Sequence, residues 1–225
     1  MKRLFAYPSR PAPRARGGRG PGLLTRRASF AGALLPLLTV ALPAAAGKLS
    51  LAEISEYLNS FRTASGNFTQ INDDGTISTG RLYIRRPGRV RFEYDPPEDM
   101  LVISDGTRVG IIDGKSNTGP EAYPLHRTPL KIILARRVDF SRERMVTGYE
   151  SDGKTTTVRA QDPEHPEYGS LGLVFTADPV ELRQWVIDDG GGSRTTVVLG
   201  DLKTGMQLAD DRFVIPGVGA ERVDR

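Results

Sequence analysis

The chain has 225 residues, no cysteine and two histidines, so thiolate metal sites and most histidine-based catalysis are excluded. Eight of its 31 Lys and Arg residues lie in residues 1–46, which hold no Asp or Glu. Residues 47–225 therefore carry 23 basic and 27 acidic side chains, a net charge of −4. A domain with that charge and no basic run lacks the electrostatic footprint of a nucleic-acid-binding protein, and we exclude that class.

Residues 1–46 have the pattern of a secretory signal peptide. Their basic segment is followed by an apolar run of 13 residues, Phe30–Leu42, and by the small residues of Pro43–Gly47. A membrane anchor is the alternative, but 13 residues are too few for a helix that crosses a hydrocarbon core of about 30 Å. We therefore expect cleavage after Ala46. Paired arginines in the basic segment leave both the general secretory and the twin-arginine route open, and a later start codon stays open as well.

The exported part begins with the signals of an amphipathic helix. Ser50 and Glu53 form a capping box, in which the Ser side chain bonds the third helical amide and the Glu side chain bonds back to the cap. Apolar residues recur at helical spacing from Leu51 to Phe61, and Gly66 is expected to end the helix. Two interpretations fit this stripe: a helix that covers a larger apolar surface, or an ordinary packing helix.

After this helix the hydrophobic period changes to two residues, which indicates strands. Arg89–Tyr94 is the clearest, because Val90, Phe92 and Tyr94 point to one face and the charged residues between them to the other. Turn dipeptides such as Asp105-Gly106 join neighbouring strands as hairpins. The expected strands are 67–71, 79–85, 89–94, 100–104, 108–112, 144–149, 155–161, 170–176, 182–188 and 194–201.

The segment between the fifth and sixth of these strands interrupts the β pattern. Pro129 is expected at the first position of a short apolar helix, with Thr128 before it as the cap. Leu130, Ile133 and Leu134 then fall on one face of this helix.

About ten strands joined by tight turns predict an antiparallel meander that curls into a barrel or half-barrel. Helices are expected at its start and in its middle, and residues 211–216 are expected to add a contact at a sheet edge. The 179 residues after the signal peptide are enough for one sizeable core. We therefore expect residues 47–225 to form one domain.

Motifs that carry catalysis or bind nucleotides are absent from the sequence. The two histidines, His126 and His165, lie in or near proline-rich loops. Asp105, Asp113 and Asp152 stand beside glycines, where turn formation explains them. We therefore expect no catalytic residue, no metal site and no cofactor, and a protein that is not an enzyme.

Arg86 is the charged residue that the strand pattern brings to an apolar face. Leu82, Ile84 and Arg86 share parity, so a strand that runs to Pro87 places Arg86 among apolar side chains. An unpaired charge there costs several kcal/mol, and carbonyls at the end of a covering helix are suitable acceptors for its five donors. In the other interpretation the strand ends one residue early and Arg86 points into water. The residues alone leave both open.

Five segments carry a resemblance to a known family. They are Phe68–Gln70, Gly80–Gly88, Arg91–Tyr94, Leu101–Gly106 and, in the middle of the chain, Thr128–Ala135. In order and spacing they resemble the LolA family, the periplasmic carriers of outer-membrane lipoproteins, and the similarity runs from Leu49 to Pro216. The resemblance implies a mainly β fold with a helical lid (α+β), an incomplete antiparallel β-barrel covered by short helices and enclosing a hydrophobic cavity.

The resemblance also implies roles for particular residues. Arg86 matches the family's arginine that latches the lid in the free state, and Leu130, Ile133 and Leu134 match its lid. Acyl chains cost about 0.8 kcal/mol per CH₂ in water, so a carrier must bury them on an apolar face. The residues expected to line that cavity are Leu82, Ile84, Val90, Phe92, Tyr94, Leu101, Ile103, Val109, Ile111, Leu173, Phe175, Trp185 and Val197.

The expected function is that of a periplasmic chaperone. It would bind the acyl chains of lipoproteins released from the inner membrane and carry them to the outer membrane. Expected partners are acylated lipoproteins, an inner-membrane lipoprotein-releasing ABC transporter, and the outer membrane or an acceptor in it, with no nucleic acid. The protein is expected to be a monomer. A periplasmic carrier or sensor of another lipid on the same fold is the alternative that the sequence leaves open.

Overall fold

The computed structural model describes residues 47–117, 119–141 and 144–217, and the expected signal peptide lies outside these residues. The strands are β1 (Thr63–Ile71), β2 (Ile77–Arg85), β3 (Arg89–Tyr94), β4 (Met100–Asp105), β5 (Arg108–Asp113), β6 (Glu121–Pro124), β7 (Val146–Ser151), β8 (Thr155–Gln161), β9 (Ser170–Ala177), β10 (Val180–Asp188), β11 (Arg194–Leu199) and β12 (Lys203–Thr204). The helices are α1 (Leu51–Asn59) and α2 (Leu130–Ile133), with 3-10 turns η1 (Leu125–Arg127), η2 (Pro166–Tyr168) and η3 (Asp210–Phe213).

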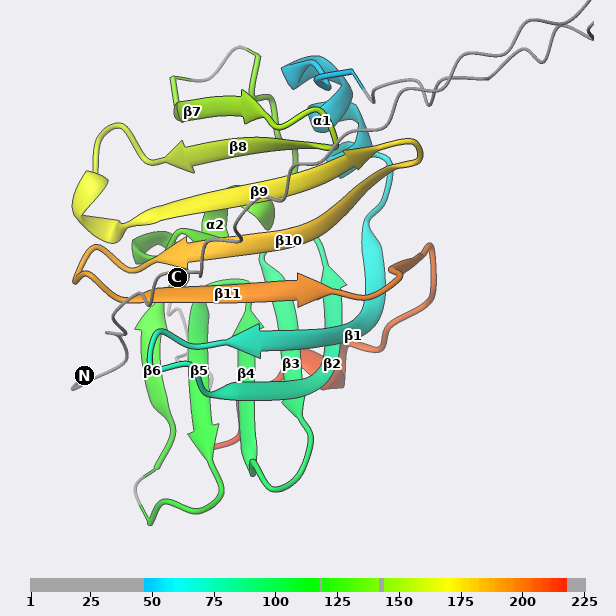
Figure 1. The fold of residues 1–225 in the computed structure, drawn as a ribbon. Helices are drawn as coiled ribbons and strands as arrows, with labels where there is room; N and C mark the ends of the chain where they lie inside the picture. Colours follow the sequence, from blue (N-terminus) through cyan, green and yellow to red (C-terminus); the bar gives the residue numbers. More distant parts are fainter. Residues whose placement is uncertain (1–46, 118, 142–143, 218–225) are drawn as a thin grey trace, which may run out of the picture. The chain divides into compact units, whose positions relative to one another are not determined.

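The described strands form one antiparallel sheet (Figure 1). Its order is β6-β5-β4-β3-β2-β1-β11-β10-β9-β8-β7, and β12 pairs with β1. β6 and β7 are separate edges, so the sheet is a half-barrel that does not close. All ten predicted strands are present. The sequence did not predict β6 and β12, which are only four and two residues long.

The two faces of the sheet differ in polarity. We call the face that carries Leu82, Phe92 and Trp185 the inner face, and the opposite one the outer face. Cross-strand pairing keeps this division, because Leu82 lies opposite Phe92 while Trp185 lies opposite both Leu173 and Val197. These five side chains are all buried, so the inner face forms one wall of the hydrophobic core.

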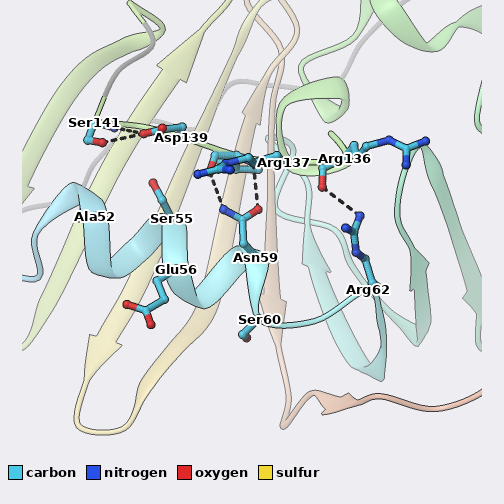
Figure 2. Close-up of a pocket in the computed structure, with 11 residues that line it drawn as sticks. Ala52, Ser55, Glu56, Asn59, Ser60, Arg62, Arg136, Arg137, Asp139 and Ser141 are labelled. Carbon is cyan, nitrogen blue, oxygen red and sulfur yellow. Dashed lines mark hydrogen bonds between the residues drawn. The ribbon is translucent and has the colours of Figure 1, made fainter.

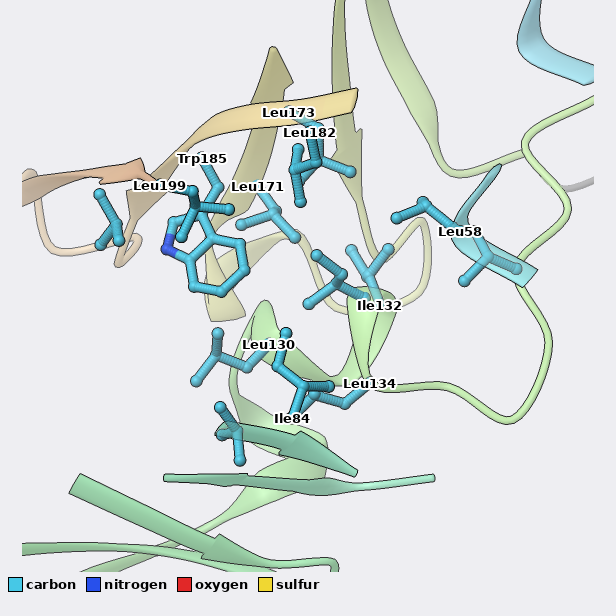
Figure 3. Packing of buried hydrophobic residues seen from close by; sticks show 14 of the residues in the cluster. Leu58, Ile84, Leu130, Ile132, Leu134, Leu171, Leu173, Leu182, Trp185 and Leu199 are labelled. Atoms are coloured by element: carbon cyan, nitrogen blue, oxygen red, sulfur yellow. The ribbon is translucent and has the colours of Figure 1, made fainter. Parts of the chain in front are cut away.

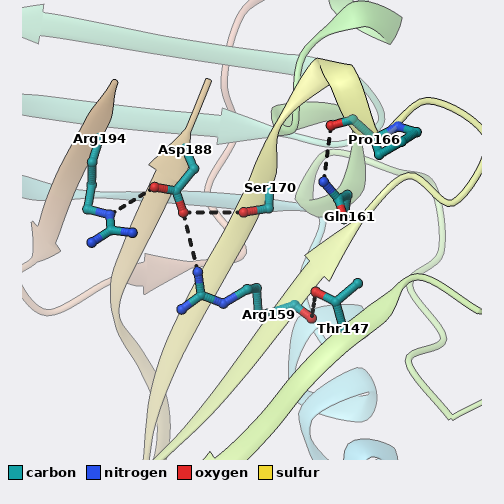
Figure 4. A network of polar contacts seen from close by, with 7 residues as sticks. All are labelled: Thr147, Arg159, Gln161, Pro166, Ser170, Asp188 and Arg194. Carbon is teal, nitrogen blue, oxygen red and sulfur yellow. Dashed lines mark hydrogen bonds and ion pairs between the residues drawn. The ribbon is translucent and has the colours of Figure 1, made fainter. Parts of the chain in front are cut away.

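The outer face of β8 to β11 is polar (Figure 4). The Asp188 carboxylate accepts from Arg194 Nε at 2.8 Å and from Ser170 Oγ at 3.3 Å, and it lies 3.4 Å from Arg159 Nη1. Such partly exposed contacts contribute little stability. They matter for register, because a slip of one residue would exchange the polar and apolar faces.

Helix α1 begins as predicted and ends earlier. Ser50 Oγ accepts from the Glu53 amide at 3.2 Å, and Glu53 Oε2 accepts from the Ser50 amide at 2.7 Å, which confirms the capping box. The helix ends at Asn59, and Gly66 lies inside β1. A Cβ at Gly66 would lie 3.0 Å from the carbonyl oxygen of Asp201. The glycine is therefore explained by close packing between chain segments and not by the end of a helix.

Helix α2 is present where predicted, with a different cap. Pro129 is itself the N-cap, and Thr128 Oγ1 donates to the carbonyl of Leu125 at 2.8 Å. The apolar side chains of the helix and its C-cap are all buried: Leu130, Ile132, Ile133 and Leu134. The helix is therefore enclosed on more than the one face that the sequence predicted.

The register of β4 corrects the expected face of two residues. Ile103 lies opposite Arg91, so it and Leu101 point to the outer face. Val102, opposite Phe92, takes the inner position. Four successive apolar residues, Met100–Ile103, give this strand no alternation that would show which residues face inward, and the expected assignment was wrong by one residue.

The segment after β12 covers the apolar part of the outer face. η3 packs on β3 and β4, and Phe213 and Ile215 are buried there. A Cβ at Gly110 would lie 2.5 Å from Ile215 Cγ2, so glycine lets this segment approach β5 closely. Residues 211–216 thus cover a face, not an edge as expected, and Ile103 is 0% exposed on the outer side of the sheet.

Replacing Phe213 by Ala is expected to lower the free energy of unfolding by about 3–5 kcal/mol, the usual cost of emptying a buried phenylalanine site. Urea denaturation measures this. Val214 is the matched control, because it is the next residue and 60% exposed. Val214→Ala should change stability by less than about 0.5 kcal/mol, and equal effects of the two changes would contradict the described cover.

Candidate functional site

The inner face of the half-barrel is covered by α1 and α2 (Figure 3). Ile54 and Leu58 of α1 belong to one buried cluster with Leu130 and Ile133 of α2 and with the strand side chains beneath them. Nine of the predicted cavity residues lie in that cluster: Leu82, Ile84, Val90, Phe92, Val109, Leu173, Phe175, Trp185 and Val197.

The other four predicted cavity residues are placed differently. Tyr94 packs against the cluster, and its hydroxyl donates to Gln70 Oε1 at 2.6 Å. Burial raises the pKa of this hydroxyl, which therefore stays protonated. Ile111 points to the inner face near its margin and is half-buried. Leu101 and Ile103 lie on the outer face and are not brought to the site.

Helix side chains occupy the space that was expected to be a cavity. Ile54 and Leu58 are almost fully buried against the sheet. Tyr57 adds edge-to-face contacts with Phe61 and Phe175, at ring-centre distances of 5.7 and 6.0 Å. The inner face is therefore a covered apolar surface, and a ligand could reach it only if the helices moved.

Arg86 extends the parity of β2 by one residue and enters this core. Its amide donates to the carbonyl of Arg62 at 2.8 Å, which continues the pairing between β1 and β2. The side chain is 6% exposed. Nη2 donates to the carbonyl of Phe61 at 2.7 Å and to that of Leu58. Of the two interpretations, the inward one describes this structure.

The guanidinium of Arg86 is a buried cation held by uncharged groups. Among the described residues no carboxylate pairs with it, and Nε and Nη1 have no hydrogen-bond partner. Its carbon lies 5.3 Å from the centre of the Phe61 ring. Burial, and then the positive charge of Arg62, lower the pKa of the group. Carbonyls at the end of α1 favour a cation there because helix C-termini carry partial negative charge.

The hydrogen bonds of Arg86 reach α1 and not the mid-chain helix that the resemblance implied. Helix α2 is fastened through a different contact, in which the Gly88 amide donates to the carbonyl of Leu134 at 2.8 Å. Ser104 Oγ holds the same turn by donating to the Gly88 carbonyl at 2.7 Å. The β2–β3 turn thus binds the C-terminal ends of both helices. A backbone amide leaves no trace in a sequence, so Gly88 could not be predicted.

A second set of contacts joins α1 to residues 138–140 in the loop that follows α2 (Figure 2). Asn59 Nδ2 donates to the carbonyl of Val138 at 2.7 Å, and the Val138 amide donates back to Asn59 Oδ1 at 3.0 Å. Ser55 Oγ accepts from the Phe140 amide at 2.9 Å. These contacts border a groove of about 790 Å³ along α1. Two polar residues four apart on one helix face were the sequence signal for this junction, and they were missed.

The described residues contain no group of three or more His, Cys, Asp or Glu side chains that could hold a metal ion. His165 lies at the surface with its Nδ1 3.0 Å from a Glu167 carboxylate oxygen. Within residues 47–117, 119–141 and 144–217, no helix is long and apolar enough to cross a membrane. The main feature of the site is therefore a covered apolar surface with one buried cation at its margin.

The family model described as "Outer membrane lipoprotein carrier protein LolA" matches residues 59–216. The chain belongs to the LolA family. It is 23% identical over 180 residues to an outer-membrane lipoprotein carrier protein of Pseudomonas syringae, covering 76% of this chain and 86% of that protein. It is 26% identical over 180 residues to the protein of the same name from Pseudomonas aeruginosa, covering 75% and 86%.

Among solved structures, the fold is similar to a LolA superfamily protein of Nitrosomonas europaea. That likeness has a TM-score of 0.41 at 10% identity and covers 74% of this chain and 98% of that one. Membership of the LolA family and the names of the curated relatives support a carrier role.

Replacing Asn59 by Ala removes both hydrogen bonds to Val138. Since each of the two bonds contributes about 1 kcal/mol, we expect the α2 segment to open more often and the Leu134 amide to exchange with solvent about thirtyfold faster. Amide hydrogen exchange measures this. Glu56→Ala is the control, on an exposed position of the same helix. If exchange at Leu134 is the same in both variants, the two helical segments are not coupled.

Proposed function

We propose that the protein is a periplasmic carrier that binds the acyl chains of lipoproteins on the inner face of its sheet. The observation that carries this proposal is a continuous apolar face beneath two short helices, with the buried Arg86 bonded to the end of one of them. Family membership and the names of the relatives support it. The proposed role is binding, without chemical turnover.

The energetics of acyl chains explain why such a face is needed. At about 0.8 kcal/mol per CH₂, a chain of ~16 carbons costs roughly 12 kcal/mol in water. The proposed lining includes Val102 in place of Leu101 and Ile103. It consists of Leu82, Ile84, Val90, Phe92, Tyr94, Val102, Val109, Ile111, Leu173, Phe175, Trp185 and Val197. The proposed lid consists of α1 and of Leu130, Ile133 and Leu134.

In the proposed mechanism, helices and acyl chains replace each other on the inner face during loading and release. In the empty protein α1 and α2 bury the inner face, and in the loaded protein acyl chains would bury the same side chains. The apolar free energies of the two states therefore largely cancel, and the few polar contacts set the balance. Arg86 stabilises the empty state, which weakens lipid binding and favours delivery.

The proposed route runs between two membranes. Cargo would come from an inner-membrane lipoprotein-releasing ABC transporter and pass to the outer membrane or to an acceptor there. The expected signal peptide supports export to the periplasm. A monomer suits a carrier that must present its opening to successive partners.

The function is tested by producing the full chain with its signal peptide in a Gram-negative host, purifying it from the periplasm and identifying what co-purifies by mass spectrometry. A triacylated protein is the expected cargo. A free lipid would favour the alternative of another lipid carrier on this fold, and a protein that carries neither would contradict both.

Replacing Arg86 by Leu is expected to leave lipoprotein loading intact and to slow its transfer to acceptor membranes at least tenfold. The physical reason is that the empty, covered state loses its polar fastening while the apolar face is unchanged. Transfer of a labelled triacylated lipoprotein from the loaded carrier to vesicles measures both steps.

Arg85→Leu is the matched control for this experiment. Arg85 is the neighbouring arginine on the outer face, where it bonds the carbonyl of Leu208 at 2.8 Å and pairs with Asp210 at 2.9 Å. It should load and transfer like the unaltered protein. Normal transfer by Arg86→Leu would show that the buried arginine has no part in release.

A further inference from the structure

Trp185 is the single tryptophan of the chain, and its indole N–H is buried with no acceptor among the residues that the structure describes. The residue is 1% exposed and meets Phe92 edge to face, with 6.0 Å between ring centres. Figure 3 shows its ring reaching from β10 into the cluster that includes Leu130 of α2. Buried polar groups are nearly always paired, so an orphaned donor in the centre of the proposed lipid-binding face requires an explanation.

Three other polar side chains of the inner face have partners, whereas two nitrogens of the Arg86 guanidinium at its margin do not. The Tyr94 hydroxyl donates to Gln70 at 2.6 Å, and Ser104 Oγ donates to the carbonyl of Gly88 at 2.7 Å. Thr156 Oγ1 accepts from the Leu49 amide at 2.9 Å. A missing hydrogen-bond partner is therefore not a general property of the uncharged polar groups on this face. A phenylalanine would also fill an apolar site there, and it would avoid the cost of burying an unpaired donor.

We propose that the indole N–H of Trp185 donates a hydrogen bond to an ester or amide carbonyl of the bound acyl chain. This inference rests on the proposed carrier function. The hydrocarbon part of an acyl chain has no acceptor, but every acyl chain is attached through a carbonyl group. The cargo thus brings the acceptor that the described residues do not supply.

The bond would fix the position of the acyl chain on a mostly apolar surface. Apolar contacts are non-directional, so they do not fix how far a chain slides along the sheet. One donor fixes the position of one carbonyl and therefore the depth of that chain. It also makes the site prefer acyl chains to alkyl chains of equal length. Its effect on the balance is opposite to that of Arg86, because it stabilises the loaded state.

The test compares two synthetic lipopeptides of equal chain length. One has two ester-linked acyl chains, and the other has the same chains linked by ethers, which lack the carbonyl. A neutral hydrogen bond predicts that the unaltered protein binds the ester about threefold to tenfold more tightly. Trp185→Phe keeps an aromatic ring but has no donor, and it should bind both lipopeptides equally.

Phe92→Leu is the control, since it trims the aromatic neighbour of Trp185 and removes no donor. It should weaken the binding of both lipopeptides and keep the preference for the ester. A merely structural role of Trp185 would predict the same behaviour for Trp185→Phe.

A second measurement needs no substitution and stands if Trp185→Phe does not fold. The unaltered protein labelled with ¹⁵N has a single indole N–H resonance, because it has one tryptophan. The ester lipopeptide should move this proton further downfield than the ether lipopeptide. Equal shifts, or an ester preference that survives in Trp185→Phe, would overturn the carbonyl bond while leaving the carrier function intact. A protein that binds neither lipopeptide would overturn the proposed function and this inference together.

Discussion

The closed arrangement of this protein depends on the bonds from the Arg86 guanidinium to the carbonyls of Leu58 and Phe61. A cation that is 6% exposed is tolerated only while acceptors surround it. If α1 lifted from the sheet, the guanidinium would lose both carbonyls and need water or another acceptor in their place. The position of α1 is therefore tied to the β2–β3 turn, and the Gly88 amide ties α2 to the same turn.

Polar contacts can favour either the empty or the loaded state, whereas apolar contacts stabilise both states to a similar degree. The inner face gains a similar burial free energy whether helix side chains or acyl chains lie on it. Hydrogen bonds are directional, and those of Arg86, Gly88 and Asn59 are made only with the helical segments in place. In the proposed mechanism these bonds favour the empty state and the Trp185 donor favours the loaded one. A carrier that must both bind and release needs the two to be close in free energy.

The sequence predicted most of this fold because its signals were local. Residues close together in the sequence determine both the Ser50 capping box and the alternation of Arg89–Tyr94. The outward direction of Ile103 could not be predicted from its neighbours, because β4 is apolar at successive positions. The segment that covers this side chain lies more than a hundred residues further along the chain. Parity gave the inward position of Arg86 as one of two interpretations, and the carbonyls that it bonds could not be predicted, since backbone carbonyls have no residue signature. The junction at Asn59 did have a signal, because Ser55 and Asn59 are polar residues four apart on one helix face, but its backbone partners at Val138 and Phe140 had none.

The choice of helices as the cover follows from backbone hydrogen bonding. A strand that filled the opening between β6 and β7 would close the ladder, and removing it would leave a row of amides and carbonyls unpaired. A helix satisfies its backbone within itself, apart from its ends. It can leave the sheet when only its end contacts and its side-chain contacts break. In α1 and α2 those end contacts are the ones to Arg86 and Gly88, so the cover is held where a helix has free carbonyls to offer.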